Sequence, residues 1–345
     1  MALTAMESAA NAGSPMPQDD PRLAIPTLKD VYLARQVVDR YLSPTPLVHS
    51  LALSEKLGFE LHLKCENLQP VGAFKVRGGV YLLSSLSAAE RKLGVVTAST
   101  GNHGQSIAYT ARLFGVRAVI YMPSVANPMK VAAMRRLGAE IVFEGADFDE
   151  CRGAAEQRAR RDRMYFVHSA NEHHLIAGVA TETLEILERQ PDLDYLIVPV
   201  GGGSGLSGAC IAGKAISSNL KVIGVQAAGA PVVYESWKQR KVLSFDRVDT
   251  FAEGLATRVA FSMPSQIIWD LVDDICLVTD REMRQAMRAL LESAHMAVEG
   301  AGAASLAAGW QLREQLQGKK VACVVSGGNV TLDGLREAMD EERSW

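Results

Sequence analysis

The sequence of 345 residues lacks several features that mark whole classes of protein. No apolar run approaches the ~18 residues that a membrane-spanning helix needs, and no apolar segment follows a basic start as in a secretory signal. No long basic run could follow a nucleic-acid backbone, and the formal net charge is only -3. These absences predict a cytoplasmic protein that has no membrane segment and no nucleic-acid partner.

Cysteine is scarce and scattered, without a Cys-x-x-Cys pair that would indicate zinc or redox chemistry. We expect reduced, buried thiols at all five positions, which are Cys65, Cys151, Cys210, Cys276 and Cys323. Nearly half of the residues (48%) are apolar, enough for a large core in two domains or one large α/β unit. Residues 1–24 are rich in Ala, Ser, Pro and Asp and are expected to form a flexible arm.

From about residue 60, short β-rich runs alternate with helical patterns, which is typical of a parallel sheet covered by helices on both faces. The predicted helices include 104–113, 129–137 and 281–296. Three strand-helix units fall within residues 91–170, so we expect a small domain there, inserted into a larger domain formed by 25–90 and 171–345. The predicted strands are 61–65, 94–98, 118–122, 140–143, 195–200, 222–226, 275–278 and 321–326.

One lysine stands out in the segment ENLQPVGAFKVRGG at residues 66–79. Lys75 lies between Phe74 and Val76 at a predicted helix start. Apolar surroundings and the nearby cation Arg77 would lower the pKa of this lysine and free its amine for Schiff-base chemistry. An isolated Phe-Lys-Val is more often an ordinary surface segment, so this interpretation depends on the rest of the chain.

A glycine loop follows the predicted strand 195–200 and precedes a helical stretch, an arrangement that binds phosphate through backbone N–H groups and the helix N-terminus. Two nucleotide patterns fail nearby. The next strand ends in Gln226 where a dinucleotide site needs an acid, and Ala215 replaces the P-loop hydroxyl. We therefore expect the monophosphate of a cofactor, with a non-catalytic nucleotide-binding module as the alternative. The loop consists of Gly201, Gly202, Gly203, Ser204 and Gly205.

Two further loops begin where predicted strands end, the edge at which open α/β sheets bind ligands. The first can receive a carboxylate through its amides and hydroxyls, and its asparagine suits a phenolic oxygen, although Asn and Gly also form simple turns. The second ends the strand 321–326 with Ser326 followed by two glycines. The first loop consists of Ser99, Thr100, Gly101, Asn102 and His103.

Together and in this order, the four motifs resemble the fold-type II pyridoxal-phosphate enzymes, particularly the short-form threonine/serine dehydratase and serine racemase branch without a regulatory domain. The resemblance covers nearly all of the chain from about residue 25. It implies two three-layer α/β/α domains with mostly parallel sheets, as in the tryptophan synthase β-subunit. It also implies pyridoxal 5'-phosphate as the cofactor and a homodimeric assembly.

The resemblance also implies a role for each motif. Lys75 is the catalytic residue and binds the cofactor as a Schiff base, with Phe74 beside the ring. The glycine loop 201–205 holds the phosphate, and the loop 99–103 receives the substrate carboxylate. Asn102 bonds the 3'-oxygen of the cofactor, and Ser326 bonds its pyridine nitrogen. Glu299 lies near the pyridine end of the ring.

A neutral serine beside the pyridine nitrogen should limit carbanion delocalisation and favour prompt loss of a β-substituent. Lys75 would release the cofactor to the substrate amine, take the α-proton, and let the β-hydroxyl leave as water. The products are a 2-oxo acid and ammonia. The sequence Lys75-Val76-Arg77 favours elimination, because the threonine and cysteine synthases of the family typically have Lys-Asp-Arg.

Departures from the family pattern leave the substrate open. Val71, Ala73 and the segment AGVAT at 177–181 replace more polar residues. L-Threonine or L-serine is the first expectation, and a hydroxyectoine-derived or hydroxyaspartate-type substrate is an alternative. Thr100 stands where racemases of the family have the serine that protonates the opposite face of the substrate. An amino-acid (serine) racemase is therefore another alternative.

Other candidate residues are given structural interpretations. Residues 226–231 contain no carboxylate, so no divalent metal is expected there. The three histidines of residues 168–174 are expected to face solvent in a polar loop. His295 and Glu299 are expected to share one helix face.

Overall fold

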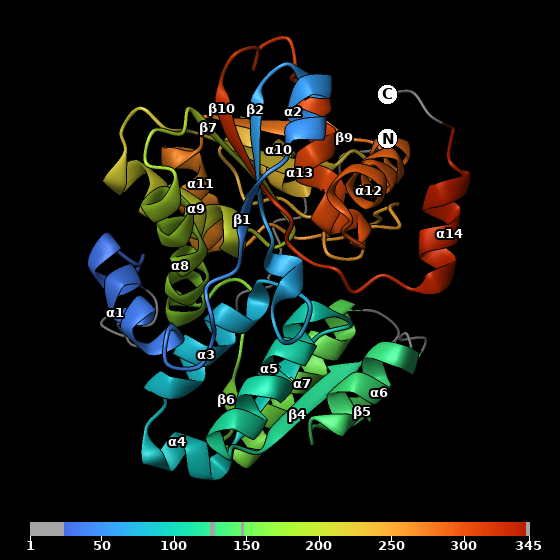
Figure 1. Cartoon of the computed structure of the whole chain (residues 1–345). Helices are drawn as coiled ribbons and strands as arrows, with labels where there is room; N and C mark the ends of the chain where they lie inside the picture. Colours follow the sequence, from blue (N-terminus) through green and yellow to red (C-terminus); the bar gives the residue numbers. More distant parts are fainter. Residues whose placement is uncertain (1–23, 125–127, 146–147, 343–345) are drawn as a thin grey trace.

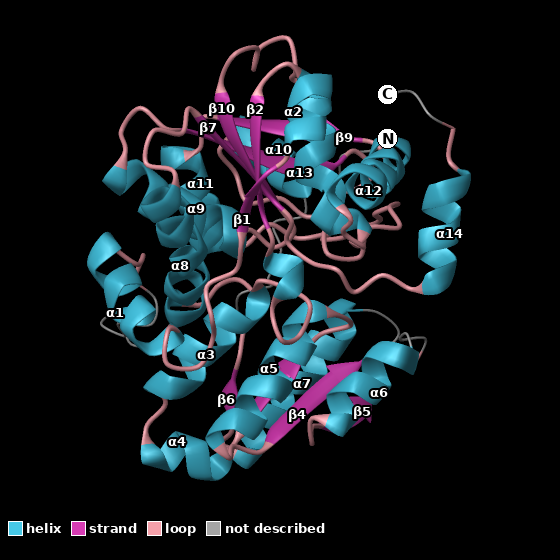
Figure 2. Cartoon of the chain, viewed as in Figure 1, coloured by secondary structure: helices cyan, strands magenta, loops and turns pink. Residues whose placement is uncertain are grey.

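The computed structural model describes residues 24–124, 128–145 and 148–342. These residues form an α/β molecule with two separate sheets, each covered by helices (Figures 1 and 2). The arm expected over residues 1–24 lies outside the described residues, apart from Ala24. No helix in the described part is long and apolar enough to cross a membrane.

The larger sheet has six strands in the order β1-β2-β10-β7-β8-β9, and only β1 runs antiparallel to its neighbour. Its side chains alternate between the two faces, as the pleat requires. Leu196 and Val198 of β7 belong to one core cluster, whereas Ile197 belongs to the other. The strands are β1 (Leu47–His49), β2 (Glu60–Lys64), β7 (Tyr195–Pro199), β8 (Lys221–Ala227), β9 (Asp274–Val278) and β10 (Lys320–Val324).

Helices cover both faces of this sheet. The cluster on one face includes residues of α8, α9, α10 and α11, and the cluster on the other includes residues of α2, α12 and α13. Outermost are α1, which packs against α8, and α14, which packs against α12 (Figure 1). The bounds are α1 (Leu28–Val38), α2 (Leu51–Leu57), α8 (His173–Arg189), α9 (Ser204–Ile216), α10 (Val232–Gln239), α11 (Ser262–Leu271), α12 (Asp280–Ala294), α13 (Gly300–Gln311) and α14 (Leu332–Asp340).

The smaller sheet has four parallel strands in the order β5-β4-β3-β6. Val96 and Val119 face a cluster that includes residues of α7, whereas Val95 and Ile120 face a cluster with residues of α3, α5 and α6. The strands are β3 (Val95–Ala98), β4 (Ala118–Met122), β5 (Glu140–Phe143) and β6 (Tyr165–Phe166). The helices are α3 (Lys75–Ser85), α4 (Ala88–Leu93), α5 (Asn102–Phe114), α6 (Pro128–Arg136) and α7 (Phe148–Asp162).

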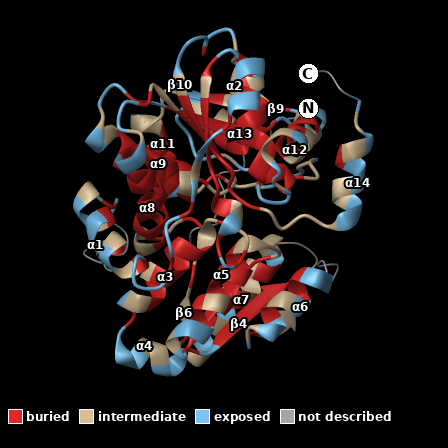
Figure 3. Ribbon diagram, in the orientation of Figure 1, coloured by how far each residue is buried: buried red, intermediate tan, exposed pale blue. Residues whose placement is uncertain are grey.

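Each sheet is thus the middle layer of a three-layer α/β/α arrangement, with both sheets mostly buried (Figure 3). This confirms the predicted fold class. The sequence did not predict β1 and β6, which have only three and two residues. So short a strand carries no readable alternation of side chains. The smaller sheet consequently has four strands, one more than its predicted strand-helix units.

The structure differs from the prediction at the turn between α12 and α13. The helix predicted to reach residue 296 ends at Ala294, because His295 adopts a left-handed conformation with φ 57° and caps α12. Glu299 lies beyond that cap and begins α13. The expectation that His295 and Glu299 share a helix face is therefore wrong. All five cysteines are free thiols, and every one except the half-buried Cys276 is buried, so the predicted burial holds for four of them.

Candidate active site

One cavity of about 540 Å³ is lined by residues of both sheet units. Segments that follow β3, β7 and β10 contribute to its wall, as expected for ligand sites at the carboxyl ends of parallel strands. The cavity brings together every residue that the sequence predicted for the site. These residues are Phe74, Lys75, Ser99, Thr100, Gly101, Asn102, His103, Gly201, Gly202, Gly203, Ser204, Gly205, Glu299 and Ser326.

Lys75 is the first residue of α3 and lines the cavity. Its amine contacts neutral groups of the cavity wall. Its Nζ donates to Ser204 Oγ at 2.7 Å and to the Ser169 carbonyl oxygen at 3.1 Å. The side chain is partly buried where it lines the cavity, and this burial lowers the pKa of Lys75 to about 8. Roughly one tenth of the amine is therefore free base at pH 7, far more than for an ordinary lysine.

The predicted effect of Arg77 on this pKa is wrong. The guanidinium of Arg77 is fully buried and bound by Glu66 and Glu185, so its charge is compensated locally. Burial of Lys75 is the cause of its lowered pKa.

The glycine loop forms a tight cradle between β7 and α9. Gly203 has φ +97°, and a Cβ on Gly201 would lie 2.2 Å from the carbonyl oxygen of Gly254. Glycine is therefore required at both positions. Because α9 begins at Ser204, its first backbone N–H groups have no partner within the helix and its positive dipole end faces the cradle. These features fit a phosphate group.

The competing nucleotide patterns are explained by ordinary structure. Gly208 and Gly213, glycines of the two nucleotide patterns, lie inside α9 rather than in a loop around a phosphate. Gln226 is buried, and its Oε1 accepts hydrogen bonds from the backbone N–H groups of Val233 and Tyr234 at 3.0 Å each. This side chain therefore caps the start of α10.

Asn102 is bonded at both ends of its side chain. Its Nδ2 donates to Glu299 Oε1 at 2.6 Å, and its Oδ1 accepts from Asn329 Nδ2 at 2.8 Å. An amide nitrogen carries two protons, so one N–H of Asn102 is left for a ligand. Burial raises the pKa of Glu299, which favours a protonated carboxyl at this position.

Ser326 follows β10 and lies close to the segment that carries the lysine. Its Oγ donates to the Ala301 carbonyl oxygen at 3.3 Å, and its own carbonyl oxygen accepts from the Phe74 N–H at 3.1 Å. A β-bridge between Ala73 and Gly327 reinforces this contact. The end of β10 and the start of α3 are therefore held together by backbone hydrogen bonds.

The residues of the loop 99–103 have different roles, although the sequence predicted one shared role for all five. Ser99 Oγ accepts from the N–H groups of Gly101 at 3.2 Å and Gly104 at 2.9 Å, so this hydroxyl stabilises the turn into α5. Thr100 and Gly101 line the cavity beside it.

His103 is a neutral side chain. Thr97 donates its hydroxyl proton to the Val167 carbonyl oxygen at 2.8 Å, so its Oγ1 must accept from His103 Nε2 at 3.0 Å. Nδ1 is then a bare acceptor, and it has no partner among the described residues. Burial lowers the pKa of His103 to about 3, so the ring supplies no positive charge to a carboxylate.

Two ion pairs that the sequence did not predict also line the cavity. Lys130 of α6 pairs with Glu253, and Asp149 of α7 pairs with Arg258. Both pairs connect the smaller sheet unit to the segment between α10 and α11. Their partners are 123 and 109 residues apart in sequence, and no local motif indicates such a pairing.

The expectation of solvent-facing histidines in a polar loop is wrong for His168. Its Nδ1 accepts from the N–H groups of Ala170 and Asn171, and its ring lies 4.7 Å from the Phe261 ring. Burial lowers the pKa of His168 to about 3. The other two histidines open α8 and are half-buried.

A lysine amine of lowered pKa beside a phosphate cradle defines an enzyme that holds a phosphorylated carbonyl cofactor through lysine. The model of the family described as "Pyridoxal-phosphate dependent enzyme" matches residues 38–327. The chain belongs to this family, and its cofactor is pyridoxal phosphate.

Known proteins are similar to this chain in sequence and in fold. An L-threonine ammonia-lyase of Thermotoga maritima is 39% identical over 89% of this chain and 76% of that protein. A serine racemase of Schizosaccharomyces pombe is 33% identical over 90% of this chain and 96% of its own. The solved structure of maize serine racemase matches with a TM-score of 0.87 and 30% identity, covering 92% of this chain and 97% of that one.

Proposed function

We propose that the protein catalyses the pyridoxal-phosphate-dependent β-elimination of a β-hydroxy amino acid, L-threonine or L-serine, to a 2-oxo acid and ammonia. The observation that carries this proposal is the position of the Lys75 amine, which lies in one cavity with the glycine cradle and the loop 99–103. The similarity to a threonine ammonia-lyase supports it.

The residues present fit the cofactor. The cradle 201–205 and the start of α9 would bind the phosphate, and Phe74 would lie beside the ring. The remaining N–H of Asn102 would bond the 3'-oxygen, while Ser326 would face the pyridine nitrogen and Glu299 would lie near that end of the ring. Lys75 would hold the cofactor covalently. The supporting observation is that all of these groups line the same cavity.

The chemistry requires one proton acceptor. The bound cofactor supplies an electron sink that acidifies the substrate's α-proton. Lys75 Nζ, partly unprotonated near neutral pH, accepts that proton and returns it to the β-hydroxyl, which then leaves as water. The neutral Ser326 favours this elimination over chemistry that needs a long-lived carbanion. Hydrolysis of the released enamine returns a water molecule and gives the 2-oxo acid and ammonia.

The substrate carboxylate binds at the loop 99–103. The Thr100 hydroxyl and the first backbone N–H groups of α5 are the donors there. Ser99 supports the turn and His103 contributes shape without charge. In this proposal only part of the loop binds the carboxylate, whereas the sequence predicted that the whole loop does.

We also propose how the chain is organised. Residues 25–90 and 171–345 form a cofactor-binding domain around the six-stranded sheet, and residues 91–170 form a substrate-loop domain around the four-stranded sheet. The family resemblance supports a homodimer, which sedimentation equilibrium tests. Five free thiols are consistent with the reducing cytoplasm, the location we propose.

A panel of amino acids tests the reaction. Purified holoenzyme is incubated with L-threonine, L-serine, L-threo-3-hydroxyaspartate and a hydroxylated 2,4-diaminobutyrate, and ammonia and 2-oxo acid are measured separately. We expect equal amounts of both products, with the highest kcat/KM for threonine or serine. Ammonia without 2-oxo acid, or no turnover of any β-hydroxy amino acid, would contradict the proposal.

Racemisation is the second candidate, because Thr100 places a hydroxyl in the cavity and serine racemases resemble the chain. The same incubations are analysed for D-serine. If racemisation is the main activity, D-serine forms faster than pyruvate, and Thr100→Ala removes it while Thr100→Ser keeps it. Faster pyruvate formation favours elimination.

A further inference from the structure

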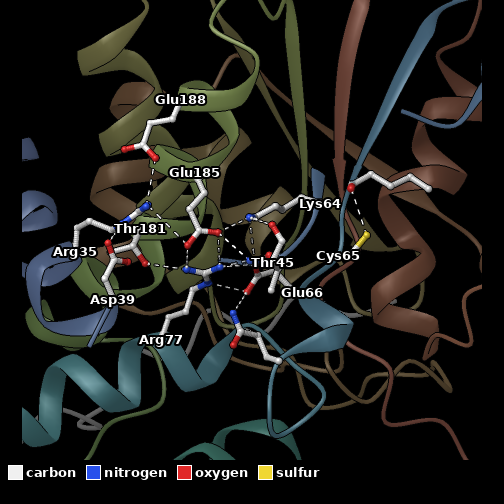
Figure 4. A network of polar contacts seen from close by, with 12 residues as sticks. Arg35, Asp39, Thr45, Lys64, Cys65, Glu66, Arg77, Thr181, Glu185 and Glu188 are labelled. Carbon is white, nitrogen blue, oxygen red and sulfur yellow. Dashed lines mark hydrogen bonds and ion pairs between the residues drawn. The ribbon is translucent and has the colours of Figure 1, made fainter. Parts of the chain in front are cut away.

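A network of buried charges lies against α3 (Figure 4), and its charged residues do not line the cavity. Lys64 ends β2 and Glu66 begins the short 3-10 helix η2 (Glu66–Leu68), while Glu185 belongs to α8. Arg77 of α3 lies between the two carboxylates. The side chains of Arg77 and Glu66 are 0% exposed, those of Lys64 and Glu185 1% and 4%.

Arg77 uses its whole guanidinium fork in this network. Its Nε and Nη2 each donate to Glu66 at 2.7 Å, and its Nη1 and Nη2 donate to Glu185 at 2.7 and 2.8 Å. Two bidentate pairs thus hold one side chain along two edges of its guanidinium. A lysine ammonium could keep the charge at this position, but it could not reproduce the planar fork.

The first turn of α3 is held on its other sides by close backbone packing. A Cβ on Gly78 would lie 2.7 Å from the Leu175 carbonyl oxygen of α8, and one on Gly79 would lie 2.5 Å from Ser106 Oγ of α5. Ser106 Oγ also donates to the Lys75 carbonyl oxygen at 2.8 Å. The turn therefore lies between α5 and α8 without free space.

Arg77 and Lys75 are two residues apart, so their side chains leave the helix about 200° apart. A force that fixes Arg77 in the interior therefore fixes the direction in which Lys75 points. Removing the fork would let the turn rotate or shift, and a displacement of about 1 Å at reacting groups can cost roughly 100-fold in rate.

We propose that Arg77 is a positioning residue, whose fork between Glu66 and Glu185 holds the first turn of α3 so that Lys75 Nζ stays against Ser204 and Ser169. The proposal rests on the function proposed above, because it assumes that Lys75 is the reacting amine. A buried ion pair is weak evidence for stability, since desolvation offsets the attraction, so its use in orientation is the more informative interpretation.

A purely electrostatic role for Arg77 makes a different prediction. A cation two residues away could act by its charge, and a lysine at position 77 would then preserve the effect. Two carboxylates surround the guanidinium, however, and the Lys75 amine contacts only neutral groups. The fork, rather than the charge, is the feature that distinguishes Arg77.

The experiment compares Arg77→Lys and Arg77→Met with the wild type. The matched control is Arg117→Lys, which alters an arginine that is 54% exposed and pairs with Glu140 on the surface. Unloaded protein is acetylated with trace acetic anhydride across a pH series, and peptide mass spectrometry gives the apparent pKa of Lys75 against the exposed Lys92. Holoenzyme kcat and KM are measured in parallel.

For both Arg77 variants we expect kcat to fall roughly 10- to 100-fold with KM changed less than threefold. The labelling pKa of Lys75 should rise from about 8 toward that of an ordinary lysine, as water reaches the displaced amine. Arg117→Lys should change neither quantity. Wild-type kcat and labelling in Arg77→Lys would overturn the proposal, and so would an effect confined to Arg77→Met, which would indicate charge.

If the Arg77 variants do not fold, Glu185→Gln decides the matter, because it keeps the size of the acceptor and removes one charged side of the fork. An altered Lys75 labelling pKa and a lower kcat support the proposal, and wild-type values reject it. The labelling arm needs neither cofactor nor substrate. A protein without elimination activity would therefore refute the proposed function while leaving the test of Arg77 intact.

Discussion

Lys75 and Arg77 are two cations in the same helical turn, and protein encloses both. Burial lowers the pKa of Lys75 to about 8. Burial also acts to lower the pKa of Arg77, but Glu66 and Glu185 outweigh it and raise the pKa above its ordinary value. The difference lies in the partners: a hydroxyl and a carbonyl for Lys75, two carboxylates for Arg77.

The comparison shows that burial alone does not decide what a buried cation does. Without a counter-ion, desolvation favours the neutral amine, which is the nucleophilic form. With two counter-ions in bidentate geometry, the charge is retained and the side chain becomes an anchor. The first turn of α3 thus has a reactive face, which carries Lys75, and a fixed face, which carries Arg77.

The largest effect is expected from removing the reactive amine. Lys75→Ala should abolish covalent cofactor binding and lower elimination by about 1,000-fold or more, because the amine of Lys130, which also lines the cavity, is paired with Glu253. The measurement is the cofactor absorbance that remains after desalting, followed by borohydride reduction and peptide mapping. The exposed Lys92→Ala is the control. Reduced cofactor on a different lysine of the wild type would contradict the assignment.

The second prediction gives Lys75 the kind of partner that Arg77 has. Ser204→Asp places a carboxylate where Ser204 Oγ lies 2.7 Å from Lys75 Nζ, which should raise the pKa of Lys75 by about 1–3 units. Acetylation of unloaded Lys75 at pH ~7.5 should then slow by about tenfold or more.

The control for this change is Ser204→Ala, which removes the hydrogen bond without adding charge and should alter labelling less than threefold. Labelling is measured on unloaded protein, because a carboxylate in the cradle also repels the cofactor phosphate. Equal labelling in Ser204→Asp and the wild type would show that the amine is not governed by its immediate partners.

The sequence predicted the surroundings of Lys75 better than those of Arg77. Lys75, the glycine cradle and Ser326 are carried by local motifs at strand ends, where a parallel sheet converges its loops. Of the two carboxylate partners of Arg77, Glu66 stands 11 residues before it in the same segment, whereas Glu185 is 108 residues away. Sequence therefore shows that an arginine follows the lysine, but not what binds it.

The same reasoning explains the other differences between prediction and structure. The two residues of β6 are a strand only because β3 pairs with them. The Lys130–Glu253 and Asp149–Arg258 pairs exist because two sheet units face one cavity. His168 is partly buried against Phe261, which belongs to another element. In each case tertiary contacts decide, and no local pattern reports them.

The third prediction concerns pH. Below about pH 8, the fraction of free Lys75 amine falls about tenfold per pH unit, so the rate constant for cofactor uptake by unloaded protein should fall in proportion. Above about pH 8 the rate should level off. Stopped-flow absorbance measures this profile. A midpoint near that of an ordinary lysine would show that the cavity does not desolvate the amine.

The smallest effect is expected at Glu182, which lies beside the fixed face on α8. It is buried, and its Oε2 has no partner among the described residues. Burial, and then the charge of Glu66, raise the pKa of Glu182. Its carboxyl is therefore the neutral acid over a wider pH range than in the unfolded chain, and Glu182→Gln should leave kcat and KM within about twofold.

The free energy of unfolding should nevertheless show the difference between Glu182 and Glu185. Because the folded pKa of Glu182 is raised, its stabilising contribution is complete below its unfolded pKa near 4.5 and is lost as pH rises through the folded pKa. Glutamine cannot ionise, so Glu182→Gln should match the wild type near pH 4 and become relatively more stable as pH rises.

Glu185 should respond in the opposite direction. Burial alone would raise the pKa of Glu185, but its hydrogen bond with Arg77 lowers it, so its contribution is present above the unfolded pKa and is lost in acid. Glu185→Gln should cost about 3–5 kcal/mol at neutral pH and less in acid. Urea unfolding at several pH values measures both variants. Loss of stability in Glu182→Gln at neutral pH would mean that Glu182 is charged when folded and that Arg77 and Lys64 serve three anions rather than two.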